Sequence, residues 1–245
     1  MNYFELRISF YLKKDIDFID NFEILSKYIS FTICDISNNK DFHTSNKFKH
    51  YSFGGFYPVE KDKVYKKGKI YTVSVRGLDE KFITTLSNDL RKNINNSYIQ
   101  AINIGIKKYK QKFITELYSL TPVIVSVSQG QKNKPIYWTM QKDGDILKLQ
   151  NQLQQNLLNK YKAFYNEELK PTQNFIQLLE IKNKTPQNIQ LTNKNNKSYR
   201  LFGNKLSIIP DEDEISQKLA FIAMSCGLGE KNSFGGGFCL GRGLI

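Results

Sequence analysis

The order of hydrophobic periodicities constrains the fold of this 245-residue chain more than any other feature. In residues 3–12 apolar and polar side chains alternate, which is the period of a half-buried strand. The segments that follow are, by the same criterion, a helix from Asp15, strands at 50–58 and 69–76, a helix at 79–92 and a strand at 97–106. The first half is therefore predicted to have the order β-α-β-β-α-β.

The second half repeats this order with weaker boundaries. Strand patterns occupy 117–127, 135–140, 175–181 and 199–209, helical patterns occupy 143–165 and 211–225, and a short apolar segment ends the chain. The Asn- and Lys-rich segment 182–197 is expected to separate two strands. The simplest account is an α+β fold of two tandem ferredoxin-like (βαββαβ) units, which we place at residues 1–112 and 113–245.

Glycine is concentrated at the end of the chain. Residues 227–245 hold seven of the fifteen glycines. Because glycine loses much backbone entropy when it is fixed, such a cluster indicates positive φ angles or a close approach to another group. A phosphate is the candidate group, since Lys231, Asn232 and Ser233 add side-chain donors to the backbone N–H groups. The spacing fits neither the P-loop nor the dinucleotide-binding pattern.

This terminal run, Gly-Leu-Gly-Glu-Lys-Asn-Ser-Phe-Gly-Gly-Gly, lies after the last predicted helix and before a short apolar strand. It resembles the C-terminal signature of the repeat-associated RNA-binding superfamily. More narrowly, it resembles the CRISPR-associated "Cas six" endoribonucleases, which cut precursor guide RNA. That family is described as tandem ferredoxin-like folds with the glycine loop in the second, so the resemblance implies the organisation that the periodicities predict.

The charge of the chain favours a polyanionic partner. Lys and Arg total 36 against 23 acids, a net charge of +13, and 14 Tyr and 17 Phe are interleaved with them. AT-rich coding bias would explain the many lysines, but it should raise Glu as well. We therefore expect nucleic acid and not a membrane surface. With no apolar run of eighteen residues and no signal-peptide layout, the protein is expected to be soluble and cytoplasmic.

Cysteine and histidine are too few for a metal centre built by the protein. The three cysteines are far apart and the chain has two histidines, so neither a disulfide framework nor a zinc set is indicated. Any catalysis is expected to need neither a metal nor another cofactor. RNA can be cut in this way when a 2′-hydroxyl attacks the adjacent phosphate, which requires a base, an acid and a cation near the phosphoryl group.

His43 is the preferred proton-transfer residue, because it lies in the polar segment 37–49, whereas His50 begins a strand. The resemblance adds two partners. A histidine in this connection, a lysine a few residues later and a tyrosine on the preceding helix are a proposed catalytic set in some family members, and His43, Lys49 and Tyr28 match that set in order and approximate spacing. Lys49 would stabilise charge, and the acid and base roles of His43 and Tyr28 stay open.

Each of these residues also has a structural interpretation. His43 and Lys49 would then be solvated, and Tyr28 would pack beside Leu25 on the first helix. The residues predicted to bind RNA are Gly227, Gly229, Lys231, Asn232, Ser233, Gly235, Gly237 and Arg242. Lysine clusters at 61–69, 107–112 and 194–200 are further candidates, although most charge runs are solvated faces. Tyr51, Phe53 and Phe234 are candidates for stacking on bases.

The sequence thus predicts a metal-independent endoribonuclease that cuts CRISPR precursor RNA within its repeats. Its partner is repeat RNA, and a CRISPR effector complex and a second copy of the chain are further candidate partners. One alternative is a non-catalytic repeat-RNA-binding subunit. The other is a general single-stranded RNA-binding protein, which would show steep salt dependence and little sequence preference.

Overall fold

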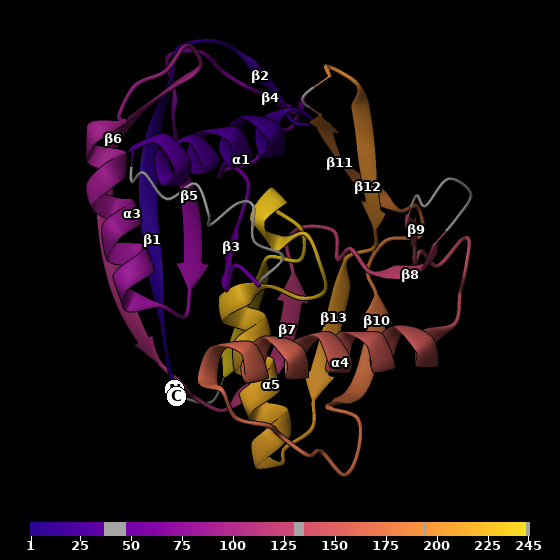
Figure 1. Ribbon diagram of the computed structural model, residues 1–245. Coiled ribbons are helices and arrows are strands. Elements are labelled where there is room, and N and C mark those ends of the chain that lie inside the picture. The colour runs from indigo at the N-terminus through magenta and orange to yellow at the C-terminus, as the bar shows by residue number, and fades with distance from the viewer. Residues whose placement is uncertain (37–47, 130–134, 194, 244–245) are drawn as a thin grey trace.

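The computed structural model describes residues 1–36, 48–129, 135–193 and 195–243. Its N-terminal half contains an antiparallel sheet with strand order β3-β5-β1-β6. The elements are β1 (Asn2–Leu12), α1 (Asn21–Phe31), β3 (Tyr51–Phe53), β5 (Ile70–Gly77), α3 (Glu80–Lys92) and β6 (Ile99–Lys110). Helices α1 and α3 cover one face of this sheet (Figure 1), where alternate β1 residues such as Leu6 and Ile8 meet Leu25 and Leu86 in the core.

The C-terminal half contains a second antiparallel sheet, with strand order β10-β13-β7-β14. Its elements are β7 (Ile114–Ser119), α4 (Ile146–Tyr165), β10 (Ile176–Ile181), β13 (Leu206–Pro210), α5 (Glu214–Cys226) and β14 (Cys239–Gly243). Leu153 and Leu157 of α4 and Leu219 of α5 are fully buried in the core of this half. Both halves therefore have the chain order that the periodicities predict, and the molecule is a mixed α/β structure.

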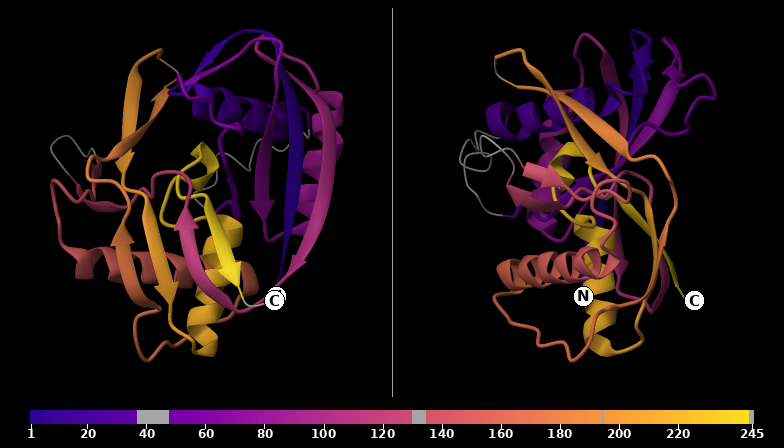
Figure 2. Two further views of the ribbon diagram at one scale, coloured as in Figure 1. Left: turned by 180° about the vertical axis from the view of Figure 1, so that it is seen from behind. Right: turned by 90° about the vertical axis from the view of Figure 1, so that its right-hand side faces the viewer.

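Smaller elements accompany the two sheets. A π-helical segment, Thr32–Ile36, follows α1, and three ribbons pair β2 (Ile16–Asp17) with β4 (Val64–Tyr65), β8 (Ser126–Gln129) with β9 (Pro135–Tyr137), and β11 (Gln187–Thr192) with β12 (Ser198–Gly203). The β11–β12 ribbon crosses to the N-terminal half (Figures 1 and 2), where Ile189 and Leu201 join the core and the Thr192 hydroxyl donates to Glu23.

The predicted boundaries fail where pairing between distant segments overrides local periodicity. The first helix begins at Asn21 and not near Asp15, because Ile16 and Asp17 pair with β4. The strand predicted at 50–58 contracts to Tyr51–Phe53. The strand predicted at 117–127 is divided into β7 and β8, since residues 120–125 connect them.

The segment 182–197 was predicted to be a polar separator, which is wrong. Strand β11 lies within it, and its alternating Ile189 and Leu191 are buried against the N-terminal half. The strand predicted at 199–209 is interrupted after Gly203. Asn204 occupies the break, where its amide donates to the carbonyl of Asn183 and accepts from the backbone of Met140.

Arg76, a member of a buried ion pair in the N-terminal half, also contacts the C-terminal half. Arg76 of β5 donates to Glu5 at 2.7 Å and to the carbonyl of Cys239, at the start of β14, at 2.5 Å. Its guanidinium group also lies 4.7 Å from the ring centroid of Phe238. Since a buried charge is tolerated only when it is paired and hydrogen-bonded, these contacts fix the end of the glycine-rich loop against the first sheet.

Among the described helices, none combines the length and the apolar character that a membrane span requires.

Candidate active site between the N-terminal half and the glycine loop

A cavity of about 370 Å³ lies where the two halves meet. Residues 48–51, which lead into β3, line one side, and residues 229–234 of the glycine loop line the other. Asn156 and Lys160 of α4 complete the wall. Segments far apart in the sequence, which the prediction assigned to catalysis and to RNA binding, thus border the same space.

The glycines of the loop serve its internal packing. Gly237 has a φ of +64°, and a Cβ there would lie 1.9 Å from the carbonyl oxygen of Leu228. The N–H groups of Gly235, Gly236 and Gly237 donate inward, to the carbonyls of Asn232, Lys231 and Pro122 respectively. Only glycine fits this close approach with left-handed backbone angles.

The side of the loop that borders the cavity is formed by residues 230–234. Lys231 is exposed, Ser233 and Phe234 are half-buried, and a short 3₁₀ turn spans Asn232–Phe234. Asn232 itself is buried, and its amide donates to the carbonyls of Leu228 and Gly236. Of the predicted RNA-binding residues, Gly229, Lys231, Asn232 and Ser233 line the cavity, and the buried Asn232 also braces the loop from within.

Lys160 is the residue that sequence reasoning missed. This buried lysine of α4 donates to the carbonyls of Gly227 and Gly229 and to the amide oxygen of Asn232, each at 2.8 Å. Burial lowers the pKa of its ammonium group to about 8. The signal lay in the helical period, because position 160 continues the buried stripe of Leu153 and Leu157, where a lysine is out of place.

His50 and Lys49 border the cavity from the N-terminal half. The Nε2 atom of His50 lies 3.1 Å from the carbonyl oxygen of Lys160, and its ring packs against Phe164 with centroids 5.2 Å apart. Burial, aided by the nearby Lys160 charge, lowers the pKa of His50 despite the opposing hydrogen bond and Asp79. A neutral imidazole that donates from Nε2–H leaves Nδ1 as an acceptor, the form that a general base requires. Burial also lowers the pKa of Lys49.

Of the other two predicted catalytic residues, the structure describes only Tyr28. His43 lies outside the described residues. Tyr28 is buried in α1, where its ring packs edge-on against Phe10 and its hydroxyl donates to the carbonyl of Asn93. Burial raises the pKa of Tyr28. Tyr28 lines a different pocket, together with Asn93, Asn95, Asn96 and Tyr98, and does not line the cavity that Lys49 borders.

Arg242 also lies apart from the cavity. It is on β14, where its guanidinium group pairs with Glu116 at 3.0 Å and lies over the ring of Tyr118. The buried Gly227 and Gly229 contribute their carbonyl groups to Lys160.

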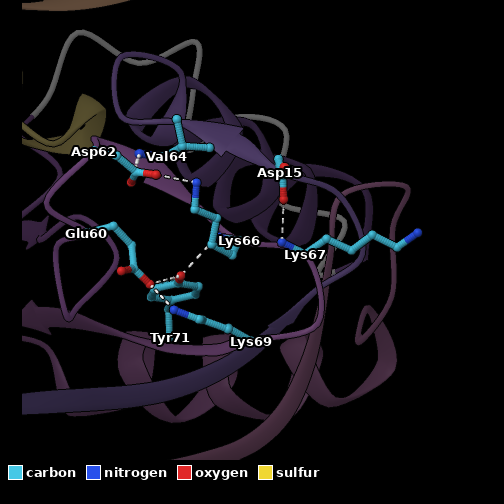
Figure 3. Close-up of polar contacts among 8 residues, drawn as sticks. All are labelled: Asp15, Glu60, Asp62, Val64, Lys66, Lys67, Lys69 and Tyr71. Carbon is cyan, nitrogen blue, oxygen red and sulfur yellow. Dashed lines mark hydrogen bonds and ion pairs between the residues drawn. The ribbon is translucent and has the colours of Figure 1, made fainter.

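The lysine cluster at 61–69 is held by acids of its own turn (Figure 3). Lys66 pairs with Asp62, and Lys69 donates to Glu60 at 2.9 Å. The Tyr71 hydroxyl also donates to Glu60, at 2.6 Å, and this bond, followed by that from Lys69, lowers the pKa of the Glu60 carboxyl. We call residues 60–71 the lysine turn. Two of its five lysines, Lys66 and Lys69, have local acidic partners, so it is a weaker polyanion surface than its lysine count indicates.

Comparison with known proteins shows which family this chain belongs to. The family model described as CRISPR associated protein Cas6, C-terminal, matches residues 106–240, more than half of the chain. The chain therefore belongs to the Cas6 family, the "Cas six" proteins that its terminal signature resembles. The CRISPR-associated endoribonuclease Cas6 2 of Methanocaldococcus jannaschii is 26% identical over 212 residues, which cover 81% of this chain and 83% of that relative.

Two solved structures have the same fold. One, described as CRISPR associated protein Cas6, superposes with a TM-score of 0.70 at 19% identity over 98% of this chain and 99% of its own. The other, described as an RAMP protein binding different RNA substrates, gives a TM-score of 0.69 at 16% identity over 98% and 99% of the two chains. The repeat-associated (RAMP) fold that the sequence predicts is thus confirmed as the fold of this chain.

Proposed function

We propose that this chain is a metal-independent endoribonuclease that cuts CRISPR precursor RNA within its repeats. The observation that carries the proposal is the cavity that places Lys49 and His50 opposite Lys231 and Ser233 of the glycine loop. Cations and a neutral imidazole around one space suit cleavage by an internal 2′-hydroxyl. The family and the relative named as a Cas6 endoribonuclease support the same reaction.

We also propose that residues 1–112 and 113–245 are two ferredoxin-like units, each with one part of the site. The two sheets support this division, because each joins its first and third strands at the centre and places the second and fourth at the edges. The N-terminal unit would then supply proton transfer, and the C-terminal unit would hold the RNA.

In the proposed reaction a base removes the proton of the 2′-hydroxyl, and the 2′-oxygen bonds to the adjacent phosphorus. The bond to the 5′-oxygen breaks, and an acid protonates that oxygen. The products are a 2′,3′-cyclic phosphate and a 5′-hydroxyl. Lys49 stabilises the negative charge on the phosphoryl oxygens, and Lys231 and Ser233 hold the backbone on the other side.

His43 is the first candidate for proton transfer and His50, which borders the cavity, is the second. The two differ in a testable way, because only one of the variants His43→Ala and His50→Ala should abolish cleavage while retaining RNA affinity. Tyr28 can join the reaction only if its hydrogen bond to Asn93 opens. Tyr28→Phe therefore separates a catalytic role, which would lose cleavage, from a packing role, which would leave the rate within about twofold.

The test is cleavage of repeat RNAs from the host genome's arrays in buffer that contains EDTA. Cleavage should persist, and mass spectrometry should find the cyclic phosphate on the 5′ fragment. A repeat RNA with 2′-deoxyribose at the cut nucleotide is the matched control, since it lacks the nucleophile and should stay intact. Cleavage that needs added Mg²⁺, or that cuts the deoxy substrate, would contradict the mechanism. Tight binding without any cleavage would favour the RNA-binding-subunit alternative.

A further inference from the structure

A polar stripe on α4 continues from the glycine loop along the helix. Gln152, Asn156 and Lys160 are four residues apart, so they lie on one face. Lys160 at one end is committed to the loop carbonyls and to Asn232. The other two members of the stripe are partly buried and line cavities beside the loop.

That space is a groove made of two adjoining cavities. The first is the cavity of about 370 Å³ already described, and the second has a volume of about 200 Å³. Asn156, Gly229 and Glu230 line both cavities, and Gln152 and Ser126 line the second. The groove therefore runs from Lys49 and His50, past the glycine loop, along the amide side chains of α4.

The amides of this groove have unused hydrogen-bonding capacity. Within the described residues, the amide oxygens of Gln152 and Asn156 are buried and have no hydrogen-bond partner. Buried polar atoms are normally paired, so an unpaired acceptor beside a cavity indicates a ligand that donates to it. By contrast, Gln155 and Asn159, which also line the second cavity, bond to each other at 3.0 Å.

Glu230, the one carboxylate among the described residues that line the groove, is already hydrogen-bonded. Both oxygens of Glu230 accept from Ser126, one from its backbone N–H at 3.0 Å and the other from its hydroxyl at 2.8 Å. Glu230 is thus held on the β8 side of the groove. Of the two unpaired amides, Asn156 lines both cavities and Gln152 lines only the second. Aromatic rings of Phe48 and Phe234 line the first cavity beside it.

We propose that this groove binds an unpaired adenine of the RNA next to the phosphate held by the glycine loop, with Asn156 reading its edge. An amide pairs with adenine through two bonds, since its oxygen accepts from the N6 amino group and its NH₂ donates to a ring nitrogen. The Watson–Crick edge of uracil has an acceptor, O4, and a donor, N3–H, where adenine has a donor, the N6 amino group, and an acceptor, N1. An amide held in the orientation that pairs with adenine therefore does not pair with uracil. Phe48 and Phe234 supply faces on which the base stacks.

The inference rests on the proposed function, because it takes RNA to be the ligand. The experiment measures by fluorescence anisotropy how tightly the protein binds two labelled 2′-O-methyl oligonucleotides of eight nucleotides. All bases are adenine in one probe and uracil in the other. These probes cannot be cut because the 2′-oxygen is capped. The wild-type protein should bind the adenine probe about tenfold more tightly, and Asn156→Leu should remove most of this preference while leaving the uracil affinity within about twofold.

Two controls make the result specific. Asn151→Leu changes an exposed amide on another face of α4 and should keep the preference. Replacing adenine by purine, which lacks the amino group, should weaken binding to the wild-type protein but not to Asn156→Leu. The purine series on wild-type protein still decides the matter if Asn156→Leu fails to fold.

Equal affinity for the two probes, a preference unchanged in Asn156→Leu, or indifference of the wild-type protein to purine would each overturn the inference. The EDTA cleavage assay reports separately on the proposed function. Cleavage with no adenine preference would reject the adenine groove alone, whereas absence of cleavage with the preference present would reject the endoribonuclease and keep the groove.

Discussion

Lys160 and the lysines of the lysine turn carry the same kind of charge in opposite surroundings. Lys160 is buried on α4 and donates to three oxygen atoms of the glycine loop. Lys66 and Lys69 are on an outer turn and pair with Asp62 and Glu60 (Figure 3). Exposed pairs of this kind contribute little to stability, whereas a buried cation with several acceptors fixes the backbone around it. The number of lysines in a segment therefore does not show where a cation organises a site.

The largest expected effect comes from removing the buried cation. Lys160→Met leaves three buried oxygens without a donor, and each unsatisfied group costs about 1–3 kcal/mol. We expect the free energy of unfolding in urea to fall by about 3–5 kcal/mol. Lys162→Met, at an exposed position two residues along α4, is the matched control and should change it by less than about 0.5 kcal/mol. Similar losses in both variants would remove the distinction between the two environments.

Glycines of the glycine loop and of the lysine turn also differ in their surroundings. Gly237 and Gly68 both have positive φ, +64° and +82°, but a Cβ at 237 would meet the Leu228 carbonyl whereas one at 68 meets no atom within 4 Å. Gly68→Ala should cost only the conformational strain, about 1–2 kcal/mol. Gly237→Ala adds a backbone clash of about 1–3 kcal/mol more. Thermal and urea unfolding measure both, and equal losses would mean that the loop is not tightly packed.

Neutralising cations should distinguish the two regions in RNA binding. Lys231→Gln removes an exposed cation at the cavity. The affinity for a single-stranded repeat RNA should then depend less on salt, and the slope of log K against log salt concentration should become shallower by about 0.7. Lys66→Gln removes a cation that Asp62 already neutralises, and the slope should not change. A larger change for Lys66→Gln would place RNA on the lysine turn.

A pH effect on His50 is the smallest that we expect. The pKa of His50 is lowered in the folded state. On acidification the unfolded chain therefore binds a proton first, as the pH falls below the ordinary histidine pKa of about 6.5. The contribution of His50 to stability is therefore complete above pH 6.5 and is lost as the pH falls through the folded-state pKa. Urea unfolding of wild-type protein and His50→Gln between pH 7.5 and 5 measures this, and parallel curves would contradict the burial of the ring beside Lys160.

The strand and helix order could be predicted because each long element has a clear period. Asp79, for example, caps α3 where the helical pattern begins, and Asp213 caps α5 two residues after the start of its pattern. Elements that depend on distant pairing could not be predicted. Strand β11 has only Ile189 and Leu191 as apolar residues in a polar segment, and it becomes a strand by packing on α1 and pairing with β12.

The site was predictable in part for the same reason. The glycine run could be found from local sequence and Lys49 from the family resemblance, and Lys49 and residues 229–234 border the cavity. Lys160 and Asn156 could not, because their roles come from the face of α4 that meets the loop. Tyr28 illustrates the converse, since its position matches the family pattern while its hydroxyl is held by Asn93 in the structure.

The central claim, that RNA lies in the cavity between residues 48–51 and the glycine loop, is tested most directly by photocrosslinking. Benzoylphenylalanine would replace either Phe234, which lines the cavity, or Tyr57, which is 72% exposed shortly before the lysine turn. After irradiation with labelled repeat RNA, we expect a strong protein–RNA adduct from position 234 and little from position 57. An adduct from position 57 with none from 234 would contradict the account.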